Sequence, residues 1–219
     1  QTFVESHIVE LGNVDGSDIF YSLNNSEYKK YDKPIIINKQ SVISSYAQKN
    51  KIKSKTVTSE YFPRDDSKKI KILSTYANQY AAAGDKTLID QLRGGNNYRT
   101  GNWQGYREDL NVIVDISKVK KINSISLGCH QDVRSWIFYP KQVDYWSSLD
   151  GEKYTYQGKV LANFPDNIEG SLQKDFKLNI KNLKARYIKI KAENYGICPD
   201  WHLGAGGKTW IFVDEITIK

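Results

Sequence analysis

Apolar and polar residues alternate with a period of two over many short stretches of this chain, as they do in β-strands that have one buried face. The pattern is clearest at residues 186–192, where Ile188 and Ile190 alternate with lysines, and at residues 211–218 near the C-terminal end. Fifteen tyrosines and many Ile, Val and Ser residues suit a pleated surface better than a helix. The pattern therefore predicts an all-β protein.

Residues 1–62 are predicted to form a small β unit of their own. Strands are expected at residues 19–23, 34–37 and 42–46, and Asn24 with Asn25 supplies a turn after the first of them. The polar residues 63–69 follow and indicate a linker. Because nothing in this first unit assembles a site, we expect it to be a spacer.

Residues 70–219 are predicted to form a second, larger β domain. Short strands separated by turn residues are expected at residues 111–116, 122–129, 141–148, 154–160, 175–178, 186–192 and 210–219. Many short strands broken by turn signals are typical of a β-sandwich or a jelly roll. The fold class expected for the whole chain is therefore all-β, with a small sandwich followed by a jelly roll.

Composition bounds the class of protein further. The chain has 219 residues, of which 39% are hydrophobic, so it can bury a core, and it contains no methionine. The missing methionine indicates a processed product or a fragment of a longer protein. No run approaches the roughly 18 apolar residues that a membrane helix requires, so we expect no membrane span.

The net charge of +7 raises the question of a nucleic-acid partner. The basic residues are spread thinly, and the nearest approaches to clusters are Lys68, Lys69 and Lys71 or the alternating Lys189 and Lys191. Such patterns are typical of solvated strand faces and of edges protected against aggregation. We therefore expect no nucleic-acid partner.

Two cysteines, Cys129 and Cys198, are too few for a disulfide scaffold or a zinc site. They could form one disulfide if the chain is exported. They could equally be two buried free thiols, because free cysteine is among the most buried residue types. The sequence leaves both alternatives open.

A candidate sugar site follows from the chemistry of pyranose rings, which offer an apolar face surrounded by hydroxyl groups. Such a ligand calls for an aromatic platform with amide, imidazole or guanidinium groups at its edge. Trp146 and Trp210 lie inside predicted strands and are expected to pack, whereas Trp201 is expected to be exposed. For Trp103 and Trp136 the sequence leaves packing and ligand binding equally open. Three loops supply the required mixture through Tyr98, Asn102 and Trp103, through Gln131, Arg134 and Trp136, and through Tyr195, Trp201, His202 and Lys208.

The first unit resembles the fibronectin-type-III-like module near the C-termini of bacterial chitobiases and β-hexosaminidases, through Ile19-Phe-Tyr-Ser-Leu-Asn-Asn and Tyr31-Asp-Lys-Pro-Ile-Ile-Ile. The second is similar to discoidin-type domains, the coagulation-factor C-type jelly roll that includes the family 32 carbohydrate-binding modules. This resemblance rests on motifs such as Val143-Asp-Tyr-Trp-Ser-Ser-Leu-Asp150-Gly151, Ala185-Arg-Tyr-Ile-Lys-Ile and Val213-Asp-Glu215-Ile. Trp201-His-Leu-Gly-Ala-Gly-Gly207 looks like the version that ends family 20 hexosaminidases of Bacteroidetes-like bacteria.

The resemblance implies a jelly roll whose candidate loops gather at one end and bind a glycan that contains galactose or N-acetylhexosamine. It also implies a second partner, the catalytic domain of the same chain upstream of Gln1, in an exported protein that is periplasmic, surface-attached or secreted. We expect this region to be a monomer. The alternatives are a purely structural module that packs on the catalytic domain, or a phospholipid- or protein-binding domain with Ile137, Phe138 and Leu203 at loop tips.

A structural Ca²⁺ ion is also implied by the resemblance. Asp90 and Glu215 match the positions of its two carboxylate ligands, and carbonyl oxygens near Arg93 would supply others. The alternative is that Asp90 caps a turn and Glu215 pairs with a neighbouring lysine or arginine.

Catalysis by this chain is not expected. Glycoside hydrolysis needs two carboxylates about 5 to 9.5 Å apart, and no spacing singles out a pair among Asp132, Glu193, Asp200 and Asp214. Adjacent residues in a strand point to opposite faces, so Cys129 and His130 do not form a nucleophile pair.

Overall fold

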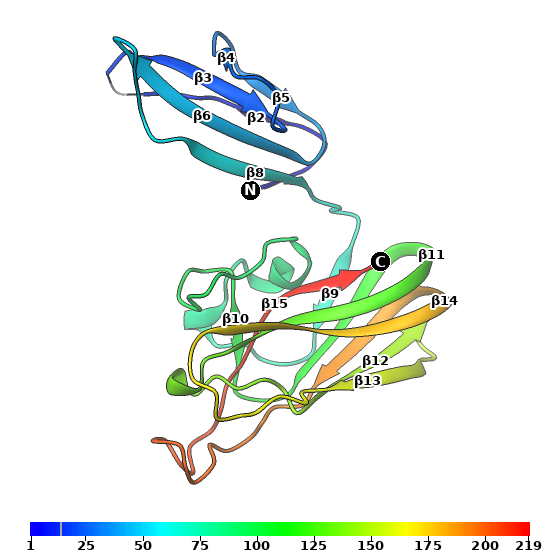
Figure 1. Ribbon diagram of the computed structural model, residues 1–219. Coiled ribbons are helices and arrows are strands. Elements are labelled where there is room, and N and C mark those ends of the chain that lie inside the picture. The colour runs from blue at the N-terminus through cyan, green and yellow to red at the C-terminus, as the bar shows by residue number, and fades with distance from the viewer. Residues whose placement is uncertain (14) are drawn as a thin grey trace. The chain divides into compact units, whose positions relative to one another are not determined.

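The computed structural model describes residues 1–13 and 15–219, and the chain divides into two compact units, Gln1–Asp66 and Ser67–Lys219. Figure 1 draws the first unit in blue and cyan. The boundary falls inside residues 63–69. Pro63 still belongs to the last strand of the first unit, β8 (Val57–Pro63), and Lys69 begins the first strand of the second, β9 (Lys69–Ile72).

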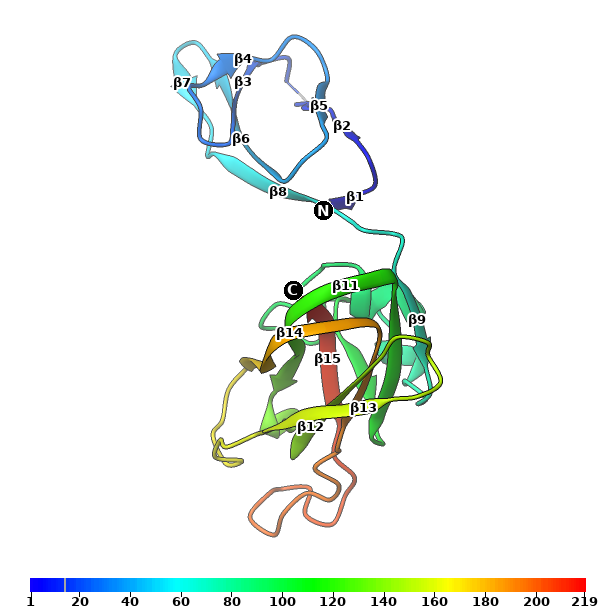
Figure 2. The ribbon, with the colours of Figure 1, turned by 90° about the vertical axis from the view of Figure 1, so that its right-hand side faces the viewer.

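The first unit is built from short strands (Figure 2). Strands β1 (Thr2–Phe3), β3 (Asp18–Leu23), β4 (Lys29–Lys30), β6 (Ser41–Lys49), β7 (Ile52–Lys53) and β8 form one sheet, in the order β1-β8-β6-β3-β4 with β7 beside β6. Strands β2 (His7–Val9) and β5 (Ile35–Ile37) pair separately. The turn expected after residue 23 is present, with Asn24 and Asn25 both at positive φ, which asparagine tolerates. Apolar residues of both sheets share one core, among them Val9, Tyr21, Ile35 and Ile43.

The second unit contains one larger set of hydrogen-bonded strands. Their order is β10-β15-β11-β14-β12-β13, with β9 beside β11. The strands are β10 (Gln104–Tyr106), β11 (Leu110–Gln131), β12 (Gln142–Ser148), β13 (Thr155–Leu161), β14 (Leu172–Ala192) and β15 (Ile211–Ile218). Three short 3₁₀ helices, η1 (Asn78–Tyr80), η2 (Gly84–Ile89) and η3 (Val133–Ser135), lie in the connections.

Strands β11 and β14 are long and bent, and each contributes to both layers of a sandwich. Residues 110–115 pair with residues 187–192, beside β9 and β12, whereas residues 124–131 pair with residues 172–179, beside β15. The register shifts between these two parts, where Ser117 and Asn182 have positive φ. Irregularities of this kind bend strands and let them pass from one layer to the other. The strands predicted at 111–116 and 122–129 are therefore halves of one strand.

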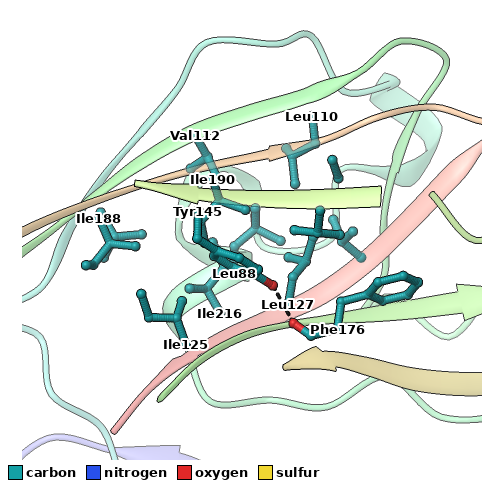
Figure 3. Packing of buried hydrophobic residues seen from close by; sticks show 14 of the residues in the cluster. Leu88, Leu110, Val112, Ile125, Leu127, Tyr145, Phe176, Ile188, Ile190 and Ile216 are labelled. Carbon is teal, nitrogen blue, oxygen red and sulfur yellow. Dashed lines mark hydrogen bonds between the residues drawn. The ribbon is translucent and has the colours of Figure 1, made fainter. Parts of the chain in front are cut away.

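The core of the second unit lies between the two layers (Figure 3). Val112 and Val114 of β11 and Ile188 and Ile190 of β14 point inward at alternate positions, as the sequence pattern predicts. Burying each such side chain stabilises the fold by about 1.5–3 kcal/mol relative to leaving it exposed. Figure 3 also shows the buried Tyr145 hydroxyl donating a hydrogen bond to the Phe176 carbonyl oxygen. The all-β sandwich prediction is confirmed.

Several loops meet at the end of this sandwich where β14 runs into the segment before β15. The Lys141 amide donates to the Glu193 carbonyl oxygen (2.9 Å), the Phe138 amide to that of Trp210 (3.1 Å) and the Trp210 amide to that of Trp136 (2.9 Å). The loop before β15 projects beyond the strands at this end, in orange-red in Figures 1 and 2. These bonds give the loops a rigid base.

Cys129 and Cys198 are buried free thiols, so the disulfide alternative is not realised. Burial raises the pKa of Cys129 well above its ordinary value. Both therefore behave as small apolar residues. None of the helices formed by residues 1–13 and 15–219 has the length and apolar character needed to cross a bilayer.

Candidate functional site

A hollow of about 330 Å³ opens at the loop end of the second unit. Trp201 and Leu203 stand at its edge, with side chains 50% and 104% exposed relative to their reference values. The other lining residues are Val133, Arg134, Glu169 and His202. They come from η3, from residues 162–171 between β13 and β14, and from residues 193–209 before β15. The hollow thus combines an exposed aromatic ring with a charged pair.

The loop that carries Trp201 is closed on itself by backbone hydrogen bonds. The Cys198 amide donates to the Gly207 carbonyl oxygen (2.8 Å) and the Gly206 amide returns a bond to the Cys198 carbonyl oxygen (3.1 Å). At the base of the loop, the Thr209 amide donates to the Gly196 carbonyl oxygen (3.0 Å). The loop is therefore a defined platform for Trp201 rather than a slack connection.

Trp136 supports this loop from below. A Cβ atom added to Gly204 or Gly207 would lie 2.4 or 2.5 Å from the Trp136 indole, closer than real contacts allow. The two glycines therefore let the loop backbone rest directly on the indole ring. Trp136 is itself held at a positive φ of 64° at the end of η3. Because the Trp136 ring is half-buried against the loop, a contact of this ring with a sugar stays a prediction.

His202 has a positioning role as well. Its ring is 7% exposed, its Nε2 pairs with the Val133 carbonyl oxygen, and its Nδ1 accepts a hydrogen bond from the Gly204 amide (2.9 Å). Because an amide donates to Nδ1, the proton of the neutral ring lies on Nε2 and is given to Val133. Both ring nitrogens are used within the protein, so His202 fixes the loop to η3. His202 also lines the hollow, and a contact of its ring with a ligand stays a prediction.

Arg134 and Glu169 form an ion pair beside the hollow, with side chains 73% and 60% exposed. The contact with Glu169 raises the pKa of Arg134. A second contact ties the same loop to the site, because the Tyr195 hydroxyl donates to the Asp166 carboxylate. Burial and then this bond raise the pKa of Tyr195 to about 12. Residues 162–171 are therefore a wall of the hollow that sequence reasoning missed.

The loop before β10 does not reach the hollow. Trp103 is 1% exposed, and its indole N–H donates to the Gly95 carbonyl oxygen (2.9 Å). Tyr98 is buried in the same aromatic cluster, with Trp210 and Phe212. The expectation that Tyr98 and Trp103 present a binding face is therefore wrong, whereas the expected packing of Trp210 is confirmed.

Gln131 is also inside the fold. Its side-chain oxygen accepts a hydrogen bond from the Tyr139 amide (3.3 Å), and its Nε2 has no partner within residues 1–13 and 15–219. Of the ten residues named in the three candidate loops, Arg134 and Trp201 line the hollow with usable groups. Tyr195 anchors the segment 162–171, the Asn102 side chain donates to the Arg93 carbonyl oxygen (3.3 Å), and Lys208 is exposed outside the hollow. The other five pack or position.

Asp90 and Glu215 lie together beneath η2, both buried. The Leu92 amide donates to Asp90 Oδ1 and the Gln91 amide to Glu215 Oε2, each at 2.8 Å. Burial, with the nearby Asp90 charge adding to it, raises the pKa of Glu215 to about 8. The bond to Leu92 agrees with the alternative in which Asp90 caps a turn.

A calcium ion fits the chemistry of this acid pair, because a hard cation prefers oxygen ligands and both side chains supply them. The guanidinium group of Arg93 is not a ligand. Its Nε lies 2.8 Å from Asp214 and its Nη2 lies 2.7 Å from Asp175. The described part of the chain gathers no group of three His, Cys, Asp or Glu residues, so backbone oxygens would have to complete the set.

Arg93 and Asp214 instead lock the loop after η2 onto the sandwich. Asp214 also accepts a hydrogen bond from the Gly94 amide (2.9 Å), and burial raises the pKa of its carboxyl while Arg93 opposes that rise. A Cβ atom at Gly128 would lie 2.0 Å from Asp214 Oδ1. Asp214 is thus a structural partner, and Glu169 is the one carboxylate among the described residues that line the hollow. Hydrolysis of a glycoside takes two.

The match to known families agrees with this architecture. Residues 66–210 match the F5/8 type C domain, and the chain belongs to that family. No curated protein matches the chain.

Among solved structures, the chain is similar to the family 32 carbohydrate-binding module of Clostridium perfringens NanJ in complex with galactose, with 14% identity, coverage of 69% of this chain and 93% of that one, and a TM-score of 0.43. It is also similar to CpGH89CBM32-5 from the same species in complex with GalNAc-β-1,3-galactose (15% identity, 69% and 94% covered, TM-score 0.43). The C-terminal domain of a Bacteroides fragilis chitobiase is similar as well (20% identity, 68% and 92% covered, TM-score 0.39).

Proposed function

We propose that the second unit binds a sugar in the hollow at its loop end, with one face of the pyranose ring stacked on Trp201. The observation that carries this proposal is the half-exposed Trp201 at the edge of a hollow that also contains the Arg134–Glu169 pair. An exposed indole on a fixed loop offers the apolar surface that a sugar ring needs. Because the loop is already closed, little ordering free energy opposes binding.

The charged pair supports a neutral sugar as the ligand. The guanidinium group of Arg134 donates hydrogen bonds, and the carboxylate of Glu169 accepts them from hydroxyl groups. Because the pair has no net charge, it offers no net electrostatic attraction to a charged sugar. We therefore propose galactose, N-acetylglucosamine, N-acetylgalactosamine or their short oligomers as ligands, bound weakly in the micromolar to millimolar range typical of small open sites.

In the intact protein, the chain would be the non-catalytic accessory region of an exported β-N-acetylhexosaminidase. Support comes from the F5/8 type C domain at residues 66–210, which follows a small β unit whose sequence resembles the fibronectin-type-III-like module of such enzymes. The hollow has one carboxylate where glycoside hydrolysis requires two, which supports binding without catalysis. The chain would act as a monomer that brings a catalytic domain of the same protein to its glycan.

A titration of the chain with these sugars tests the proposal. Isothermal calorimetry should show saturable binding, and Trp201→Ala should weaken it by at least about tenfold, because stacking is lost together with buried area. Leu149→Ala is a matched control, since Leu149 is an exposed apolar residue in the turn after β12 and away from the hollow. Wild-type protein that binds no sugar on a broad glycan array would overturn the proposal and leave the purely structural alternative.

The phospholipid alternative requires exposed apolar residues at loop tips, and two of the three residues expected there are not exposed. Ile137 and Phe138 are buried, and Leu203 alone of the three is exposed. A single leucine beside Trp201 gives a small apolar area for insertion into a bilayer. Co-sedimentation with anionic vesicles that is lost in Leu203→Ala, without any sugar binding, would favour this alternative.

We further propose that Asp90 and Glu215 hold a structural Ca²⁺ ion together with backbone carbonyl oxygens. The ion would neutralise the buried acid pair and tie the loop after η2 to β15. Added Ca²⁺ should then raise the melting temperature more at pH 8 than at pH 5, because Glu215 must lose its proton to bind. Equal melting temperatures with and without Ca²⁺ at pH 8, or an undiminished shift in Asp90→Asn, would contradict this proposal.

A further inference from the structure

A row of side chains crosses the outer face of the sheet formed by β9, β11, β14, β12 and β13. Cross-strand pairing places Lys71 opposite Ile113, Ile113 opposite Lys189, Lys189 opposite Trp146 and Trp146 opposite Tyr156. Neighbouring strands lie about 4.8 Å apart, so the row spans about 19 Å. The alternate residues Val112, Ile188, Ile190 and Tyr145 point into the core, so this row faces away from it.

Aromatic and basic groups in this row touch one another. The rings of Trp146 and Tyr156 lie 5.4 Å apart, tilted by 58°, and the Lys189 ammonium lies 5.5 Å from the centre of the Trp146 ring. Tyr156 is 50% exposed. Trp146 thus packs as expected, but it does so half-buried on the outer face and not in the core between the layers.

Polar contacts hold the aromatic end of the row in place. The Tyr156 hydroxyl donates to Asp144 Oδ1 (2.9 Å), and the side-chain amide of Gln142 donates through Nε2 to Asp144 Oδ2 (2.8 Å). The Tyr156 ring is thus fixed at its far end as well as against Trp146. A preorganised aromatic pair of this kind loses little entropy when a ligand stacks on it.

The row contains two lysines, Lys71 and Lys189, and belongs to the unit that carries the net positive charge of the chain. Residues 1–66 contain nine basic and nine acidic residues, whereas residues 67–219 contain 23 basic and 16 acidic residues, so the whole net charge of +7 lies on the second unit. Of the nearby acids, Asp115 pairs with Arg186 and Asp109 with Lys191, whereas Asp144 accepts hydrogen bonds from Gln142 and Tyr156. Within the described residues, neither Lys71 nor Lys189 takes part in an ion pair.

We propose that this outer face is a second binding surface, distinct from the hollow at the loop end, and that it takes a linear acidic polysaccharide. The apolar faces of successive sugar rings would lie on Trp146 and Tyr156, and carboxylate groups of the chain would lie beside Lys189 and Lys71. Charge complementarity and the length of the row select a charged polymer rather than a monosaccharide.

A polysaccharide fits this face better than a single-stranded nucleic acid does. The two rings are steeply tilted to each other, so they do not offer the parallel platforms on which successive bases stack. The proposal is independent of the loop site, and its failure would leave the sugar proposal for the hollow untouched.

Affinity electrophoresis of the whole chain tests the surface, with polygalacturonate as the acidic polysaccharide and its methyl ester as the matched neutral polymer. Wild-type protein should be retarded by polygalacturonate, less so as salt increases, and much less by the ester. Trp146→Ala and Tyr156→Ala should each weaken binding about fivefold or more, and Lys189→Gln about threefold. Trp201→Ala should leave this binding unchanged.

Circular dichroism melting of each variant separates a lost surface from a lost fold, and Lys189→Gln tests the face without removing a ring. The proposal is overturned if wild-type protein is not retarded, or if all three outer-face variants bind as wild type does. It is also overturned if Trp201→Ala removes the binding. Tighter binding of oligothymidylate than of polygalacturonate, lost in the same variants, would replace it with a nucleic-acid surface.

Discussion

Two loops of the second unit have similar compositions but opposite structures. Residues 93–106 and residues 195–209 are both rich in glycine, and each contains a tryptophan with polar neighbours. Trp103 of the first loop is 1% exposed, whereas Trp201 of the second is 50% exposed.

The difference lies in which indole the glycines contact. In the first loop, a Cβ atom at Gly94 would lie 1.9 Å from the Trp103 ring, so the glycine makes room for the tryptophan of its own loop. In the second, Gly204 and Gly207 make room for Trp136 of a different segment, and Trp201 is left outside. In this protein, the tryptophan of a glycine-rich loop is buried where the glycine packs against that tryptophan. It is exposed where the glycines pack against a ring from another segment.

The largest expected effect is the loss of stability when Trp103 is removed. Trp103→Ala leaves a cavity where a fully buried indole and its hydrogen bond to Gly95 were, and it should lower the free energy of unfolding by about 3–5 kcal/mol. Trp201→Ala should change it by less than about 1 kcal/mol, because the ring is half exposed. Chemical denaturation of the two variants measures the contrast, and equal losses would contradict the assignment of one ring to the core and one to the surface.

The next effect concerns the acid pair beneath the buried loop. The pKa of Glu215 is about 8 in the folded protein against an ordinary value of 4.5, so the folded state holds a proton that the unfolded state has lost between these pH values. Stability should therefore fall as pH rises from about 4.5 to 8, by an amount on the order of 2–4 kcal/mol, and level off above pH 8.

Glu215→Gln supplies the control for this pH dependence. Other groups titrate in the same range, and burial lowers the pKa of His130, which acts in the opposite direction. Both proteins contain His130, so the difference between their unfolding free energies isolates Glu215. A difference that does not change between pH 5 and pH 8 would show that Glu215 has no raised pKa.

A smaller loss of stability is expected in the exposed loop when its contact with Trp136 is disturbed. Gly204→Ala places a methyl group against the indole and should cost about 1–3 kcal/mol, because the ring or the loop must move. Sugar binding should weaken together with it, since Trp201 is carried by that loop. Gly95→Ala is the matched control, because a Cβ atom there meets nothing within 4 Å. Unchanged sugar affinity in Gly204→Ala would show that the position of Trp201 does not depend on the contact between this loop and Trp136.

The smallest effect on stability is expected at the exposed ion pair. Arg134→Gln and Glu169→Gln should leave the unfolding transition unchanged, because exposed ion pairs contribute little. Each should weaken sugar binding about tenfold, since a charged hydrogen-bonding partner is lost. Calorimetric titration of both variants checks this. A variant with a lower melting temperature but normal sugar affinity would show that the ion pair stabilises the fold and does not contribute to binding.

The strand pattern was predictable because alternation with a period of two records which face of a strand is buried. It shows in Val112 and Val114 and again in Ile188 and Ile190. The continuity of β11 and β14 was not predictable, because the pattern is interrupted where the strands bend at Ser117 and Asn182.

The candidate site was predicted only in part. Trp201 stands out because proline, aspartate and glycine surround it. Composition cannot tell which ring a glycine contacts, so the sequence does not reveal that Trp103 is buried. The wall at residues 162–171 was missed because Asp166 and Glu169 offer no aromatic signal. The direction of the strands is a signal that could have revealed this segment, because it leaves β13 at the same end of the sandwich as residues 193–209 leave β14. The fibronectin-type-III assignment of the first unit stays a prediction.

The most direct measurement of the central claim is an amide and indole NMR spectrum recorded during titration with galactose and N-acetylgalactosamine. The chain has five tryptophans, and each gives one indole N–H signal that a Trp→Phe variant can assign. The account predicts that the Trp201 signal shifts on saturation while those of Trp103 and Trp210 stay in place. A shift of the Trp103 signal without one at Trp201, or no shift at any sugar concentration, would contradict it.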